Sequence, residues 1–244
     1  MSDQRLQNEI AHGKHLKKVW RGTLWYWETP AGQRRWDRRV KMLTAHIRPA
    51  MEVLEIGCGV GYFTQEIAKT KAKITAIDIS PDLLEVAREK LSASQVTFRI
   101  ENAYQMNFPG DTFDTIVGSS TLHHLDVDQA LGEFFRVLKP GGSLYFTEPN
   151  MMNPQVFLER HTRFFGKLIE KSPNETAFFR RKLKNDFLKA GFKDIQIVPF
   201  DFLHPLTPNC LISVINRAGM ILERIPLLRE IAGSLAITAC KPSS

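Results

Sequence analysis

Cysteine is scarce in this chain of 244 residues, which holds only three. They lie far apart and form no CxxC pair, which argues against a zinc site and against a disulfide framework. We therefore predict no metal site and a reducing compartment, the cytoplasm. The three are Cys58, Cys210 and Cys240.

Long apolar runs are missing as well. The N-terminus is polar and charged, without the apolar core of a secretory signal, so export is not expected. The most apolar stretch, residues 210–231, is interrupted by charged residues, whereas a bilayer span needs about 20 largely apolar ones. The stretch therefore predicts no transmembrane segment, although it could lie on a membrane as an interfacial helix.

Charge is unevenly placed. Residues 1–50 carry all of the chain's net charge of +7, and they also hold all four tryptophans. A basic, aromatic segment can hold phosphates and stack bases, so an RNA substrate is one hypothesis. The segment is expected to be helical, and we place a boundary near Arg48-Pro49, between an N-terminal extension (1–48) and the main domain (49–244).

One helix of this extension begins at Thr29-Pro30. An apolar stripe at helical spacing would make Trp36 structural, together with Val40, Leu43 and Ile47. The four arginines then fall on the remaining faces, where they are either solvated or hold an anionic group. They are Arg34, Arg35, Arg38 and Arg39.

From residue 52 onward short apolar runs alternate with helix-period stretches, which predicts an α/β fold with a doubly wound, mainly parallel sheet. Strands are expected at 53–56, 73–77, 96–100, 113–118, 143–147, 192–200 and 234–239. Helices are expected at 62–69, from Pro81 behind the cap Ser80, at 128–138 before Pro140-Gly141-Gly142, and at 175–190 before Gly191. Residues 204–231 form an apolar, proline-punctuated insert before the last strand.

The first predicted strand runs into a glycine loop, Leu-Glu-Ile-Gly-Cys-Gly-Val-Gly at 54–61. Its glycines allow a tight turn and close approach of the backbone to a ligand, at the strand end where open α/β sheets bind ligands. The spacing is GxGxG, not the GxGxxG of dinucleotide sites, and Glu55 suits a positively charged ligand better than a diphosphate. Asp78, at the end of the second strand, can accept both hydroxyls of a ribose.

Four motifs in order extend this pattern: VLEIGCGVG at 53–61, AIDIS at 76–80, FDTIVGSSTLHHL at 113–125 and RVLKPGGSL at 136–144. Over residues 52–150 the chain resembles the class I S-adenosylmethionine-dependent methyltransferases. The resemblance implies a seven-stranded sheet with an antiparallel last strand and helices on both faces. It also implies S-adenosylmethionine as cofactor and S-adenosylhomocysteine as product.

By this resemblance the glycine loop surrounds the methionine part of the cofactor, with Cys58 as a small filler. Asp78 binds the ribose, Ile79 covers one face of the adenine, and the backbone of Ser119 meets the methionine amino group. Asn102-Ala103 meets the adenine edge, where the family more often has Asp-Ala. The cofactor-binding candidates are thus Glu55, Gly57, Cys58, Gly59, Asp78, Ile79, Asn102, Ala103 and Ser119.

Methyl transfer from a sulfonium needs alignment of donor and acceptor and, for a hydroxyl acceptor, removal of a proton. His123 and His124 are candidate bases after the fourth strand, unless the pair only packs the short helix expected at 120–125. Glu148 and Asn150 end the fifth strand and could also face the acceptor. Enzymes that methylate adenine or glutamine amino groups in this superfamily usually carry Asn/Asp-Pro-Pro-aromatic, and this chain has Ser-Ser-Thr-Leu there.

The insert has apolar residues near helical spacing, which fits either core or dimer packing, or a lid or interfacial helix for a lipid-linked acceptor. We predict methyl transfer to a small molecule, at oxygen, with an anionic or lipid-linked acceptor and a monomeric or homodimeric chain. The alternatives are an RNA methyltransferase and a non-catalytic cofactor-binding protein. The apolar positions are Leu211, Val214, Ile215, Ala218, Leu222 and Ile225.

Overall fold

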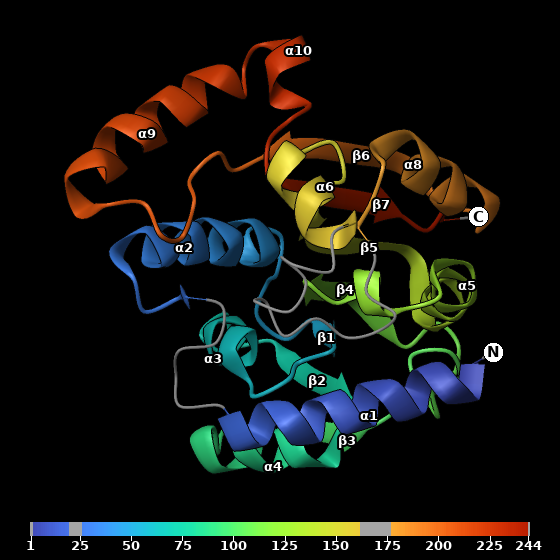
Figure 1. The fold of residues 1–244 in the computed structure, drawn as a ribbon. Helices are drawn as coiled ribbons and strands as arrows, with labels where there is room; N and C mark the ends of the chain where they lie inside the picture. The colour runs from blue at the N-terminus through green and yellow to red at the C-terminus, as the bar shows by residue number, and fades with distance from the viewer. Residues whose placement is uncertain (1, 20–25, 162–176, 244) are drawn as a thin grey trace.

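The computed structural model describes residues 2–19, 26–161 and 177–243 (Figure 1). Their strands form one seven-stranded sheet in the order β3-β2-β1-β4-β5-β7-β6. All neighbours are parallel except β7, which is antiparallel to both β5 and β6. The predicted fold class is confirmed. The strands are β1 (Glu52–Ile56), β2 (Lys73–Asp78), β3 (Val96–Ile100), β4 (Phe113–Ser119), β5 (Leu138–Pro149), β6 (Lys193–Phe200) and β7 (Ser234–Cys240).

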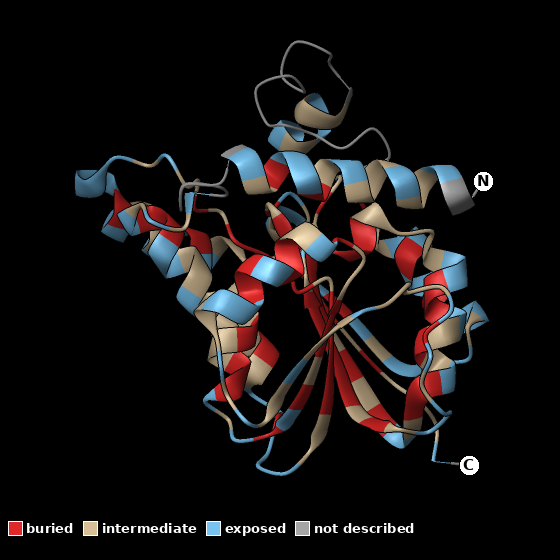
Figure 2. Cartoon of the chain, turned by 90° about the horizontal axis from the view of Figure 1, so that it is seen from below, coloured by how far each residue is buried: buried red, intermediate tan, exposed pale blue. Residues whose placement is uncertain are grey.

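Helices cover both faces of this sheet (Figure 2). Their starts follow the predicted caps, because Thr29 Oγ1 accepts from Gly32 N at 2.9 Å and Ser80 Oγ accepts from Leu83 N at 3.4 Å. The helices are α1 (Ser2–Val19), α2 (Pro30–Thr44), α3 (Tyr62–Ala68), α4 (Pro81–Lys90), η2 (Leu122–His124), α5 (Val127–Val137), α6 (Pro154–His161), α8 (Arg180–Lys189), α9 (Asn209–Leu222) and α10 (Pro226–Arg229).

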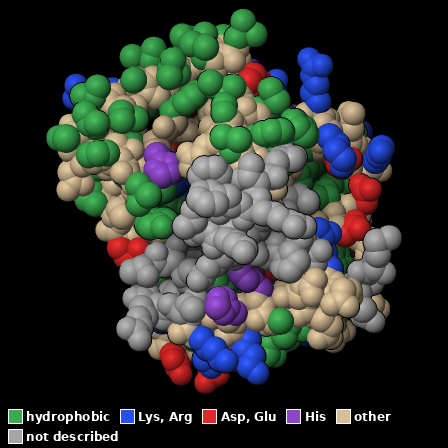
Figure 3. Space-filling view, viewed as in Figure 1, with side chains coloured by type: hydrophobic (Ala, Val, Ile, Leu, Met, Phe, Trp, Pro, Cys, Tyr) green, Lys and Arg blue, Asp and Glu red, His purple; other side chains and the backbone are tan. Residues whose placement is uncertain are grey.

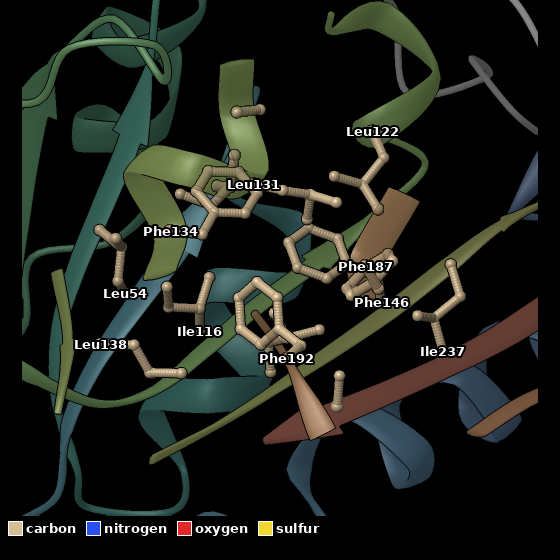
Figure 4. Packing of buried hydrophobic residues seen from close by; sticks show 14 of the residues in the cluster. Leu54, Ile116, Leu122, Leu131, Phe134, Leu138, Phe146, Phe187, Phe192 and Ile237 are labelled. Atoms are coloured by element: carbon tan, nitrogen blue, oxygen red, sulfur yellow. The ribbon is translucent and has the colours of Figure 1, made fainter. Parts of the chain in front are cut away.

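Alternation along the strands gives the sheet two apolar faces. On one face Ile116 and Phe146 pack with Phe134 of α5 and Phe187 of α8 (Figure 4). On the other, alternate strand residues pack with α2, α3 and α4. Burial on both sides fixes the strand register, because a slip by one residue would move each apolar side chain to the wrong face.

Two predicted boundaries are wrong. Residues 177–179 are extended instead of helical, and α8 begins only at Arg180; residues 175–176 lie outside the described part of the chain. The backbone of Phe178 pairs with the end of β5, and this tertiary pairing overrides the helical periodicity. The Pro140-Gly141-Gly142 turn lies inside an irregular β5, which already begins at Leu138, so α5 ends one residue earlier than expected.

The structure decides between the two alternatives for the arginines of α2: three of the four hold an anionic group, and that group is a carboxylate of this chain. Arg39 is only 4% exposed, and Asp201 Oδ2 accepts from both Arg39 Nη1 and Arg35 Nε at 2.8 Å. Arg38 forms a bidentate pair with Glu223. Their partners are Asp201, which directly follows β6, and Glu223 of the insert, about 160 to 185 residues later in the chain, so α2 alone cannot reveal them. Of the four, Arg34 is exposed as expected.

Trp36 is structural, as predicted, because it stacks on Phe63 with ring centroids 4.2 Å apart. Burial along the expected stripe increases toward its C-terminal end. Trp36 and Val40 are half-buried, whereas Leu43 and Ile47 are buried. Two of the four tryptophans, Trp20 and Trp25, lie outside the described residues.

The insert is helical, as predicted, and its position follows from strand direction. Since β6 and β5 are both antiparallel to β7, β6 runs parallel to β5 and ends at the same edge of the sheet as β1 and β4. The insert therefore leaves the sheet at the edge that carries the glycine loop. Within the described residues, no helix is both long enough and apolar enough to cross a bilayer.

Candidate active site

The candidate residues meet at one edge of the sheet. The strands β2, β1, β4 and β5 are neighbours in that order, so the segments that follow them lie side by side. This is the edge at which open α/β sheets bind ligands.

The glycine loop between β1 and α3 is fastened to β2, because Cys58 N donates to Ile77 O at 3.0 Å and Gly59 N donates to Asp78 Oδ2 at 2.9 Å. Gly57 and Gly59 have φ of 64° and 52°, in the region that favours glycine. A Cβ on Gly57 would lie 2.4 Å from Thr121 Cγ2, whereas one on Gly59 would meet nothing within 4 Å. Gly57 thus serves packing, and Gly59 borders open space that a ligand can fill.

Glu55 is a buried acid, only 3% exposed, and its Oε2 has no hydrogen-bond partner among the described residues. Burial raises the pKa of this carboxyl to about 7; the nearby hydroxyl of Thr64 opposes the rise, and the charge of Asp78 adds to it. A buried acceptor without a partner is costly, so the site favours a ligand that brings a cationic donor.

Asp78 is already held by the backbone, because Oδ1 accepts from Ser80 N at 2.8 Å and Oδ2 from Gly59 N. Burial raises the pKa of its carboxyl, and these two hydrogen bonds oppose the rise. Asn102 is a turn residue whose Oδ1 accepts from Tyr104 N at 3.0 Å. Ile79 is half-buried, and Ala103 packs against the main apolar cluster.

Cys58 is buried, and burial raises the pKa of its thiol well above the usual value. A thiol in this state is a poor nucleophile, in agreement with its predicted role as a filler of the loop.

A second cluster follows β4 and β5, centred on Glu148, which is 1% exposed. Its Oε1 accepts from Thr121 N and Leu122 N, each at 2.8 Å, and its Oε2 lies 2.7 Å from His123 Nδ1. Glu148 therefore holds the loop and one histidine instead of facing an acceptor directly. Thr121 was missed by the sequence analysis, because only its position beside Gly57 and Glu148 makes it important. In the same loop, Ser119 Oγ lies 2.7 Å from Thr147 Oγ1.

His124 joins this cluster to the N-terminal helix. Its Nδ1 lies 3.0 Å from Glu9 Oε2 of α1, and its ring centroid lies 4.3 Å from that of His123. Further along α1, a Cβ on Gly13 would lie 2.3 Å from Ser80 Oγ, so the helix sits close on the start of α4. Figure 2 shows α1 lying across this edge of the sheet. This position of α1 could not be predicted from the sequence, because the helix carries no strong apolar stripe.

Asn150 anchors the insert. Its Nδ2 donates to Glu230 O at 2.8 Å and to Ala232 O at 2.7 Å, and its side chain is buried. The amide is thus engaged by the backbone that leads into β7, and the expectation that it could face the acceptor is not supported.

Comparison with known proteins agrees with this geometry. A family model described as a methyltransferase domain matches residues 54–146. A demethylmenaquinone methyltransferase from Bacillus cereus is 28% identical over 188 residues, which cover 68% of this chain and 79% of that protein.

Two solved structures share the fold. The N-methyltransferase NodS from Bradyrhizobium japonicum, in complex with S-adenosylhomocysteine, has a TM-score of 0.66 at 16% identity, covering 96% of this chain and 99% of that one. Phosphoethanolamine N-methyltransferase 2 from Haemonchus contortus, in complex with S-adenosylmethionine, has a TM-score of 0.62 at 17% identity. That match covers 85% of this chain, which spans about half (53%) of the Haemonchus protein.

The chain is therefore an S-adenosylmethionine-dependent methyltransferase with the class I fold, as its motifs predict. S-adenosylmethionine is its methyl donor. The residues present fit this molecule, because the orphaned Oε2 of Glu55 suits its ammonium group and the space beside Gly59 leaves room for it.

Proposed function

We propose that the chain methylates a hydroxylated, apolar small molecule at oxygen, with His123 as general base. The observation that carries this proposal is the buried contact of 2.7 Å between His123 Nδ1 and Glu148 Oε2 at the cofactor edge of the sheet.

Glu148 sets the state of the imidazole. A carboxylate only accepts hydrogen bonds, so it favours the tautomer in which Nδ1 carries the proton and donates. Nε2 is then the basic nitrogen of the ring, the arrangement in which a second residue orients a histidine base. Glu148 acts as a positioning residue, and its two bonds to Thr121 N and Leu122 N keep it in place.

S-adenosylmethionine supplies an electrophilic methyl group on its sulfonium. His123 Nε2 would take the proton of the acceptor hydroxyl, whose oxygen would then receive the methyl group, with the thioether of S-adenosylhomocysteine as the leaving group. Within the cofactor site, we propose that Glu55 holds the ammonium group and Asp78 the ribose hydroxyls. The loop at Gly57–Gly59 and Ser119 would border the methionine part, and Ile79, Asn102 and Ala103 the adenine.

Two observations favour a small, apolar acceptor. The relative from Bacillus cereus is named for demethylmenaquinone, a small molecule. The insert at the cofactor edge presents apolar side chains, among them Leu211 and Ile221 at 46% and 60% exposure. An anionic acceptor finds less support, because Arg35, Arg38 and Arg39 are already paired with carboxylates of this chain. The same pairs weaken the RNA alternative, because they engage three arginines of the basic N-terminal segment on which it rests.

The test compares His123→Asn with His46→Asn, a matched change at an exposed histidine that stacks on Tyr145. Acceptors are demethylmenaquinol, simple catechols and aliphatic alcohols, with the product identified by mass spectrometry and NMR. We expect kcat to fall by about 10²–10⁴ in His123→Asn, with unchanged affinity for S-adenosylmethionine, and to stay at the wild-type value in His46→Asn.

Equal kcat in the two variants would remove His123 from the mechanism. Methylation at carbon or nitrogen would overturn the assignment to oxygen. Tight cofactor binding with no turnover of any acceptor would favour the non-catalytic alternative.

A further inference from the structure

The outer face of α9 carries a second apolar stripe. Its positions within α9 follow a 3-4-3 spacing, which places them along one side of the helix. Val214 and Ile221 are 65% and 60% exposed, although both are aliphatic. Figure 3 shows hydrophobic side chains gathered over α9 and α10 on this side of the molecule. The stripe consists of Leu211, Val214, Ala218 and Ile221 of α9, and Ile225 follows it between α9 and α10.

This stripe is not the one that attaches α9 to the protein. The inner face does so, where Ile212 packs with Ala31 and Leu203, and where a Cβ on Gly219 would lie 3.1 Å from Phe202 Cβ. The outer stripe continues into the next helix, since Leu227 is 84% exposed. Aliphatic residues exposed in a continuous row commonly mark an interaction surface.

Positive charge flanks the stripe. Arg217 and Arg224 are exposed, lie seven residues apart beside it, and form no ion pair with a carboxylate of the described residues. The two acidic residues of this region are engaged elsewhere, Glu223 by Arg38 and Glu230 by Arg180. The face therefore combines aliphatic side chains with uncompensated cations.

We propose that the outer face of α9 and α10 is a docking surface for a membrane of anionic phospholipids. Aliphatic side chains of such a helix enter the boundary between headgroups and acyl chains, and arginines meet the lipid phosphates. A second copy of this chain fits less well. Two-fold pairing around Ala218 would bring Arg217 of one copy close to Arg217 of the other, without a carboxylate between them.

The position of the insert suggests why such a docking surface would matter for the cofactor edge of the sheet. Asn150 and the Asp201–Arg39 pair fix both ends of the insert to the cofactor edge of the sheet. A protein docked through α9 would therefore hold that edge close to the membrane, where an apolar acceptor would dissolve. The docking itself goes beyond the methyl transfer and requires neither cofactor nor acceptor.

The test is co-sedimentation of the full chain with vesicles of phosphatidylglycerol and phosphatidylcholine, compared with phosphatidylcholine alone. We expect binding to the anionic vesicles that weakens as salt rises. Val214→Glu/Ile221→Glu should lower the affinity at least about tenfold for each residue, and Arg217→Gln/Arg224→Gln about fivefold for each. The arginine variant keeps the apolar stripe, so it tests the surface even if the glutamates disturb α9.

Leu188→Glu and Lys184→Gln/Lys189→Gln are matched controls, because these residues are exposed on α8. They should bind vesicles like the wild type. Equal binding to both vesicle types, or equal losses in the α8 controls, would overturn the proposal. A dimer in analytical ultracentrifugation that Val214→Glu/Ile221→Glu converts to monomers, without vesicle binding by the wild type, would assign the surface to a second copy. None of these outcomes depends on whether His123 is the base.

Discussion

Glu55 illustrates how a single buried carboxyl prepares a site for a cation. The strand β1 carries it into the interior, where Oε2 finds no protein donor. Burial moves its pKa to about 7, so near neutral pH the empty site holds a mixture of the acid and the carboxylate. A ligand with an ammonium group favours the carboxylate, and the residue thereby links cofactor binding to proton release.

The pH dependence of stability tests this residue. The folded-state pKa of Glu55 is about 7 against an ordinary 4.5, so its contribution to stability is fully present below pH 4.5 and is lost as the pH rises through about 7. Without cofactor, we expect the free energy of unfolding to fall by about 3 kcal/mol over that interval because of this group. Denaturant unfolding at several pH values should show that Glu55→Gln lacks this loss. An unchanged slope in the variant would contradict the assignment.

At the scale of elements, buried charges join α2 to Asp201, which lies between β6 and the insert. Asp201 Oδ2 serves two arginines, and burial lowers the pKa of Arg39 to about 10 despite the attraction of that carboxylate. The arginines hold the pKa of Asp201 below its usual value, although its own burial acts in the opposite direction. Neither element would keep its charges in this interior without the other.

Removing the negative charge of Asp201 should therefore lower the free energy of unfolding. Asp201→Asn keeps the shape of the side chain and a residue type that tolerates the positive φ of 76° found there. We expect a loss of about 3 kcal/mol, because Arg39 stays buried without a counter-charge. Glu66→Gln at the surface pair with Lys69 is the control and should cost at most about 0.5 kcal/mol.

Unfolding of the two variants by urea measures both changes. Since the folded pKa of Asp201 is lowered, its contribution is present above the ordinary pKa and is lost as the pH falls through the folded value. The difference between the wild type and Asp201→Asn should therefore shrink in acid. A loss for Asp201→Asn no greater than for Glu66→Gln would refute the coupling.

The elements also show what a sequence can predict. Strand and helix starts such as Ser80-Pro81 were correct, because caps and apolar periodicity depend on neighbours in the chain. The glycine loop and Asp78 were correctly brought to one edge for the same reason. The helix predicted at Phe178 was wrong, because the backbone there forms a bridge to Asn150. The burial of Arg39 could not be predicted either, because its partner Asp201 is distant in sequence.

At the scale of the molecule, the two N-terminal helices, α1 and α2, contact different parts of the protein. One of them, α2, holds Asp201 and, through Arg38, Glu223 of the insert, while α1 lies across the cofactor edge. Its Glu9 reaches His124 at 3.0 Å, its Lys17 reaches Glu85 at 2.6 Å, and Gly13 allows close contact with Ser80. We propose that residues 1–48 form a cap on the domain of residues 49–244, with α1 as the part that closes over the cofactor.

This cap predicts a separation of cofactor binding from folding. In Gly13→Leu the new side chain has no room, because a Cβ there would lie 2.3 Å from Ser80 Oγ, so α1 must leave α4. We expect the affinity for S-adenosylmethionine to fall by about tenfold, the equivalent of roughly 1.4 kcal/mol, while the sheet domain stays folded. Trypsin should then cleave faster at Lys14, Lys17 and Lys18. Gln7→Leu adds the same side chain on the exposed side of α1 and should change neither quantity. Wild-type affinity in Gly13→Leu together with faster cleavage would show that α1 detaches without serving the cofactor site.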